Sequence, residues 1–128
     1  MKIEIIELQH IALQVKHVEE SIAFYKDILR LEQLPRPAFN FLGAWFRLGN
    51  HQELHLIEGR VKDVESSNHS NHFALKVADI IHTEQFLQLK NIPMMGPKKR
   101  PDGAWQIFIK DIDGHTIEFF QEEDGGKQ

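Results

Sequence analysis

The sequence contains no cysteine, which excludes disulfide bonds and thiolate metal ligands. It also has no apolar run long enough to span a membrane, and the charged residues 1–7 do not form the apolar core of a secretory signal. The 15 basic and 19 acidic residues are mixed along the chain, and Lys98-Lys99-Arg100 is its only basic run, which argues against nucleic acid. We therefore expect a cytoplasmic protein that acts on a small molecule.

The chain contains an internal repeat. The segment HIALQV at 10–15 returns as HFALKV at 72–77. Each copy begins with a histidine and continues with alternating apolar residues, which predicts a strand that starts with a metal-competent side chain. The length of 128 residues fits one domain with a substantial core, so we predict a single domain, 1–128, made of two modules at about 5–60 and 68–122.

Each predicted strand is followed by the same series of local signals. Apolar residues recur at helical spacing between Val18 and Leu29, and Asp79 is a good N-cap for a second helix. Turn signals at 48–51 and 111–114 predict a hairpin late in each half. The tripeptide Gly-Ala-Trp also occurs in both halves, at 43–45 and 103–105, which we take as equivalent places.

Strand parity selects among the eight histidines of the chain. Side chains two residues apart in a strand share a face, so His10 lies beside the small Ala12, and His72 occupies the corresponding place in the second half. Aligning the last strand of each half puts His55 opposite Glu118. Glu53 lies on the same face as His55, so parity leaves both open as the fourth donor. A mixed nitrogen and oxygen set of this kind suits zinc, nickel, iron, cobalt or manganese.

A histidine at the start of a strand is more often a surface residue or a hydrogen-bonded one than a metal ligand. The position of Glu118 favours a functional interpretation, because a carboxylate between Ile117 and Phe119 is costly to bury unless it is paired or bound to a metal. Aromatic and cationic side chains on the neighbouring strands are candidates for substrate binding, although surface solubility also explains several of the cations. These candidates are Trp45, Arg47, Arg100 and Trp105, with Arg36 and Lys98 as further cations to test.

The run DIDGHTIE at 111–118 resembles the D-P-D-G-x-x-I-E signature of the vicinal oxygen chelate superfamily, the glyoxalase, bleomycin-resistance and dioxygenase group, with Ile112 in place of proline. The resemblance covers roughly 8–121 and includes both histidine-led strands. It implies an α+β fold in which two βαβββ modules form a curled mixed sheet around a metal cup. The implied ligands come from the first and last strands of the modules and map onto His10, His72 and Glu118, with His55 preferred over Glu53 as the fourth.

The resemblance also implies a function. It indicates a metal-dependent lyase or isomerase of the lactoylglutathione lyase type, whose small substrate chelates the metal through two adjacent oxygens. Glu118 is then the first candidate for the catalytic base and Glu53 the second. Gln14 stands where glyoxalase I has a glutathione-binding arginine, so glutathione is not the expected substrate.

Two alternatives from other functional classes remain. One is an Fe(II) dioxygenase of the same superfamily, because two histidines and a carboxylate suit that metal. The other is a metal-free protein that binds an antibiotic or another small molecule. In each case we expect a homodimer, because exposed edge strands need covering.

Overall fold

The computed structural model describes residues 1–123 and contains two compact units, Met1–Lys62 and Asp63–Gln128. Each unit has one four-stranded mixed sheet. This α+β architecture confirms the predicted fold class, and neither sheet closes into a barrel. Whether the two units act as the single domain expected from the sequence stays a prediction.

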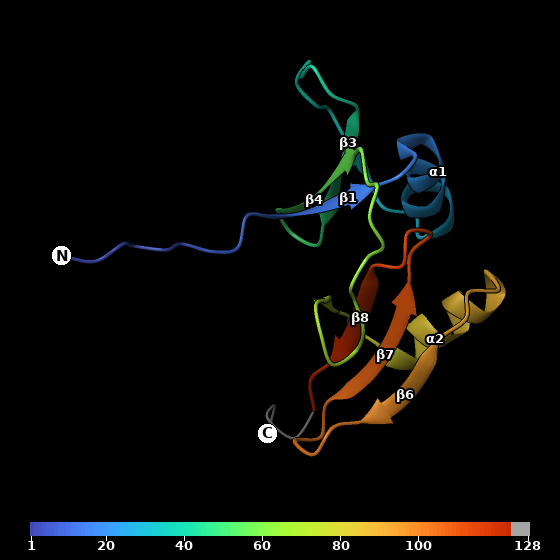
Figure 1. Cartoon of the computed structure of the whole chain (residues 1–128). Helices are drawn as coiled ribbons and strands as arrows, with labels where there is room; N and C mark the ends of the chain where they lie inside the picture. The colour runs from blue at the N-terminus through green and yellow to red at the C-terminus, as the bar shows by residue number, and fades with distance from the viewer. Residues whose placement is uncertain (124–128) are drawn as a thin grey trace. The chain divides into compact units, whose positions relative to one another are not determined.

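The first unit follows a βαβββ order, with strands in the spatial order β1-β4-β3-β2 (Figure 1). The outer strand β1 pairs in parallel with β4, whereas the other pairs are antiparallel. Residues 1–9 precede β1 as an extended segment without helix or strand. The elements are β1 (His10–Val15), α1 (Val18–Ile22), the π-helical segment η1 (Ala23–Ile28), β2 (Gln33–Leu34), β3 (Gly43–Leu48) and β4 (Gln52–Glu58).

The second unit repeats this plan, with strands in the order β5-β8-β7-β6 and a parallel pair formed by β5 and β8. Helix α2 packs against β6, β7 and β8 (Figure 1). No helix within the described residues is long and apolar enough to cross a membrane. The elements are β5 (Phe73–Lys76), α2 (Ile80–Leu89), β6 (Met95–Lys99), β7 (Trp105–Lys110) and β8 (Thr116–Gln121).

The local signals that define the second helix and the two hairpins are confirmed. The Asp79 carboxylate accepts hydrogen bonds from the backbone N–H groups of Ile81 and His82, at 2.9 and 3.2 Å. Gly49 has φ +66° in the first hairpin, a conformation that glycine adopts without steric cost. In the second hairpin, Asp111 accepts from the backbone N–H of His115 at 2.8 Å. These side-chain contacts satisfy backbone groups that the helix and strand ends leave unpaired.

The first helical segment differs from the expected continuous stripe. It begins as α1 and changes to a π-helix at Ala23, where the N–H of Leu29 donates to the carbonyl of Phe24 at 2.9 Å. The neighbouring rings of Phe24 and Tyr25 are both buried and pack edge to face. An α-helix turns consecutive side chains about 100° apart, whereas the wider π turn reduces that angle and lets both rings face the core.

The repeated Gly-Ala-Trp tripeptides are not structurally equivalent, and that expectation is wrong. Trp45 pairs with His55, and the residue that pairs with Glu118 at the corresponding place is Phe108. Trp105 lies three residues earlier in β7 and pairs with Gln121. An odd offset reverses the face of a strand, so the two tryptophans lie on different faces of their sheets.

One face of each sheet forms the core. In the first unit, Phe46, Leu54 and Leu56 are fully buried. In the second, Ile107 and Ile117 are fully buried, and α2 contributes the buried Leu87. The opposite face of each sheet carries the polar residues that parity selected in the sequence.

The N-cap gives a stability prediction. Replacing Asp79 by alanine should lower the free energy of unfolding by about 1 kcal/mol, because two N–H groups at the start of α2 lose their acceptor. Urea denaturation followed by circular dichroism measures this loss. His17 is a matched control, since it occupies the N-cap of α1 without a side-chain cap hydrogen bond, so His17→Ala should change stability by less than about 0.5 kcal/mol. Equal effects of the two substitutions would contradict the capping role.

Candidate functional site

The first unit collects five predicted site residues on one sheet face. The β1–β4 register pairs His10 with Glu53, and the β3–β4 register pairs Trp45 with His55 and Arg47 with Glu53. Directly paired residues share a face, so all five side chains lie on the same side. This is the face opposite the buried Leu54 and Leu56.

Three rings on this face form a continuous stack. The imidazole of His55 lies between the His10 ring and the Trp45 indole, with both centroid distances 4.1 Å and interplanar angles of 13° and 6°. Ala12 pairs with His55 and adds only a methyl group beside it. The stack holds His55 in a defined orientation, whereas His10 is exposed and contacts its chain neighbour Gln9.

Glu53 interacts with His55 more directly than with any other residue. Its Oε1 lies 2.9 Å from His55 Nε2, and both side chains are largely buried. The pKa of Glu53 lies below its usual value, chiefly because of this hydrogen bond, with further contributions from a Gln9 hydrogen bond and from the charges of His55 and Arg47. A carboxylate with a lowered pKa stays ionised to lower pH and is a weaker base.

The second unit places the other two predicted ligands together. His72 Nε2 lies 3.0 Å from Glu118 Oε1, and the Glu118 side chain is only 6% exposed. The amide of Gln106 donates to the other carboxylate oxygen at 2.9 Å. Both oxygens of this buried carboxylate therefore have partners, as a buried charge requires.

Both nitrogen atoms of the His72 ring have a partner that fixes its orientation. Its Nδ1 lies 2.9 Å from the carbonyl oxygen of Ser70, while Nε2 faces Glu118. Because a carbonyl oxygen can only accept, Nδ1 carries a hydrogen and donates it, which directs Nε2 toward the carboxylate. A proton must then lie between Nε2 and Glu118. A cation bound by these two groups would displace that proton.

The alignment of His55 with Glu118 is confirmed by the strand registers. His55 pairs with Ala12 of β1, and Glu118 pairs with Ala74 of β5, the corresponding alanine of the repeat. Glu53 occupies the place of Thr116, two residues earlier. The register shows structural equivalence and does not decide which side chain binds a metal.

The four predicted substrate-binding residues lie in different settings. Trp45 and Arg47 share the face of His55, as described above. Arg100 forms a bidentate ion pair with Asp102, which lowers the pKa of that carboxyl to about 2, and its guanidinium lies 5.7 Å from the Phe120 ring centroid. Trp105 lies on the sheet face opposite Glu118, so strand parity does not support its predicted role.

Gln106 was missed by the sequence analysis. Its signal is a polar residue between Trp105 and Ile107 in an otherwise apolar strand, at a position that parity places beside Glu118. The Ser70 carbonyl had no sequence signal, because any residue type supplies a backbone oxygen.

The donors lie in two sets, one in each unit, and within the described residues no three histidine, aspartate or glutamate side chains form a cluster that could hold a metal. The first set contains His10, Glu53 and His55, and the second contains His72 and Glu118. Binding of one metal by His10, His55, His72 and Glu118 therefore stays a prediction.

Comparison with known proteins identifies relatives over nearly the whole chain. The Bacillus subtilis (strain 168) protein YwbC, described as uncharacterized, is 27% identical over 123 residues, covering 89% of this chain and 96% of that protein. The crystal structure of a putative glyoxalase family protein from Bacillus anthracis has a TM-score of 0.82 and 27% identity, covering 96% of this chain and 100% of that one.

More distant structures share the fold. The Agrobacterium tumefaciens lactoylglutathione lyase has a TM-score of 0.71 at 20% identity, with 90% of this chain and 92% of that one covered. The model of the Glyoxalase/Bleomycin resistance protein/Dioxygenase superfamily matches residues 7–119. The chain therefore belongs to the Glyoxalase/Bleomycin resistance protein/Dioxygenase superfamily.

Proposed function

We propose that this protein is a metal-dependent, glyoxalase-like lyase or isomerase whose small substrate is chelated through two adjacent oxygens. The observation that carries the proposal is the buried Glu118 carboxylate, which contacts His72 through one oxygen and Gln106 through the other. Burying a carboxylate lowers the stability of the folded state, and a catalytic role would explain why the protein retains one at this position. Members of this superfamily commonly bind a divalent metal.

The donor residues fit a divalent cation in type, and two of the histidines already have an orienting outer contact. The hydrogen bond from His72 Nδ1 to a backbone carbonyl is the outer contact that orients a metal-binding imidazole, and Glu53 provides a comparable contact to His55. Nitrogen lone pairs lie in the plane of the imidazole ring, so the stacked rings of His10 and His55 cannot both point at one ion. The His10 ring must therefore rotate to become a ligand. Its exposure makes that rotation inexpensive. We propose His10, His55, His72 and Glu118 as the ligands of one ion, which when bound would polarise the substrate oxygens.

The two glutamates have different proposed roles. Gln106 holds one oxygen of Glu118, and we assign the other, which pairs with His72, to accepting a proton from carbon beside a carbonyl. Glu53 has a lowered pKa and its carboxylate is engaged with His55, so we assign it to positioning His55. Trp45 and Arg47 share the His55 face and are the proposed substrate contacts of the first unit.

Metal content tests the ligand set first. Protein purified without chelator or affinity tag should contain about one equivalent of metal per chain by mass spectrometry. A His10→Ala, His72→Ala double variant should lose it. Exposed histidines outside the two donor sets provide the control, so His17→Ala, His82→Ala should retain the metal.

Sedimentation of the same samples tests the proposed homodimer, which a single species at the chain mass of 14.9 kDa would contradict.

The identity of the bound metal separates the two enzymatic alternatives. Nickel or zinc would favour the isomerase, whereas iron with oxygen consumption would favour a dioxygenase. No metal in wild type even after reconstitution would overturn the proposal in favour of a metal-free binding protein.

The choice between His55 and Glu53 as a ligand has a separate test. Removing a direct ligand with His55→Ala should abolish stoichiometric binding, whereas Glu53→Gln should weaken metal affinity about 10- to 100-fold, as expected for an outer contact. Competition with a chromogenic chelator measures both affinities. The reverse order of effects would make Glu53 the ligand.

Proton transfer by Glu118 is tested by deuterium exchange into hydroxyacetone, which offers two adjacent oxygens. With metal-loaded protein in D2O, Glu118→Gln should slow exchange about 10²- to 10⁴-fold, because the amide cannot accept the carbon-bound proton. Glu122→Gln is the matched control, since Glu122 is exposed and pairs with Lys76. Exchange and metal content that both survive Glu118→Gln would remove this residue from the site.

A further inference from the structure

The second unit contains a groove of about 600 Å³, and its lining includes Phe108 of β7 and Thr116 of β8. Its apolar lining comes from Pro93, Met94, Met95 and Phe108, at the start of β6 and along β7. Ser67 and Asn68 line the other side. This volume falls in the range of small-molecule sites, which are mainly apolar with a few polar groups.

The groove is continuous with the candidate site through Phe108. This residue pairs with Glu118 across β7 and β8, which places both side chains on the same sheet face. Its ring meets the His72 imidazole edge to face, with centroids 5.7 Å apart. A molecule held by His72 and Glu118 therefore has an apolar wall next to it.

Hydrogen bonds fix the walls of the groove. The Asn68 amide contacts the Met95 sulfur at 3.4 Å and so links the two sides. Lys110 donates to the Ser66 carbonyl and to the Thr116 hydroxyl, both at 2.9 Å. The Thr116 N–H donates to the Ser66 hydroxyl oxygen at 2.7 Å. The loop that carries Ser67 is thus attached to both β7 and β8.

The described lining of the groove is mainly apolar and contains one charged side chain. Among the described lining residues Lys110 is the one cation, and its ammonium group donates to oxygens of Ser66 and Thr116. Glutathione carries two carboxylates, and a single lysine cannot pair with both. Methionine side chains instead adapt their shape to alkyl and aryl groups, and Met94 and Met95 lie next to each other here.

We infer that the groove binds an apolar alkyl or aryl substituent of the substrate, whose adjacent oxygens lie at His72 and Glu118. The inference rests on the proposed function for its link to catalysis, whereas the groove itself is testable without metal. The substrate class is accordingly a 2-oxo or 2-hydroxy compound with an apolar side group.

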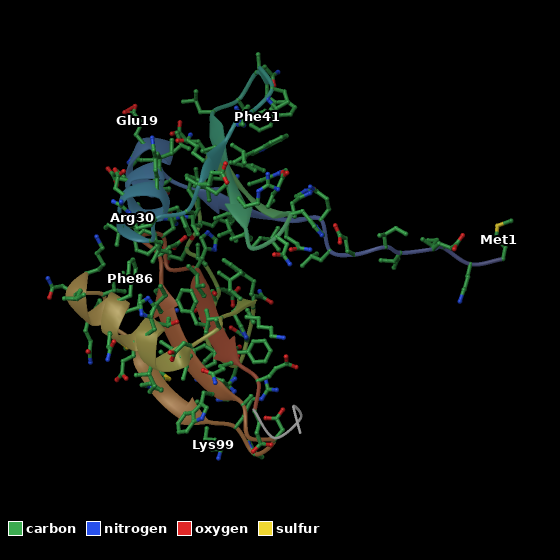
Figure 2. The ribbon with its side chains drawn as sticks, turned by 180° about the vertical axis from the view of Figure 1, so that it is seen from behind. Met1, Glu19, Arg30, Phe41, Phe86 and Lys99 are labelled. Atoms are coloured by element: carbon green, nitrogen blue, oxygen red, sulfur yellow. The ribbon has the colours of Figure 1, made fainter. Side chains whose placement is uncertain are left out.

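The first experiment uses metal-free protein labelled with ¹³C at the methionine methyl groups. The chain has three methionines, of which Met94 and Met95 line the groove, whereas Met1 begins the extended segment before β1 (Figure 2). Titration with the neutral probe 2-phenylethanol should shift the Met94 and Met95 signals saturably and leave Met1 unchanged. Absent shifts, or equal shifts of all three signals, would overturn the groove as a binding site.

A charged substitution gives a matched comparison. Met95 is 52% exposed, so Met95→Glu should fold normally and weaken probe binding at least tenfold, as followed by the Met94 signal. Leu89→Glu introduces the same charge at an 81% exposed position of α2 outside the lining, and it should bind the probe like wild type. Equal affinities of the two variants would contradict the proposed occupant.

The second experiment connects the groove to the metal. Affinities of metal-loaded protein for 2-oxo acids should rise about fourfold per methylene from pyruvate to 2-oxohexanoate. Met95→Glu should flatten this series, whereas Leu89→Glu, outside the lining, should keep the wild-type series. A flat series in wild type would overturn the link between groove and substrate. Loss of metal binding with intact probe binding would instead overturn the proposed function and leave the groove in place.

Discussion

The arrangement of this molecule depends on the parallel pairing of the first and last strand in each unit. Parallel partners must be separated by a long connection, and here that connection contains a helix and the two intervening strands. The pairing places the start of one strand beside the start of the other. His10 and His55 can stack for this reason, and His72 can meet Glu118, although each pair is distant in the chain.

Strand parity places the apolar core on one face of each sheet and the candidate donors on the other. On one face of each sheet the alternate residues are aliphatic or aromatic and are buried, as Leu54 and Ile117 show. On the other face the same strands carry His55 and Glu118. A shift of one residue in the register would exchange the two faces, so the apolar core also determines where the candidate donors lie.

Local patterns were sufficient for much of this description. The alternation around His10 and His72, the Asp79 cap and the glycine turns each depend on residues within a few positions, so the sequence carries their signal directly. The π-helical turn at Ala23 could not be predicted in this way, because it depends on packing two adjacent rings. The equivalence of the tryptophans also failed, since three matching letters do not encode a register.

The two halves of the repeat have diverged in how they hold their donors. The first surrounds His55 with rings and an ionised Glu53, and the second buries Glu118 under hydrogen bonds from Gln106 and His72. Stacked rings remain in contact when they are partly exposed to water, whereas a buried carboxylate is stable only while all of its hydrogen-bond partners are present. A change in the first half should therefore reorient a candidate donor at little cost in stability. In the second half, stability and the proposed chemistry depend on the same three side chains, so a substitution made to alter one should also alter the other.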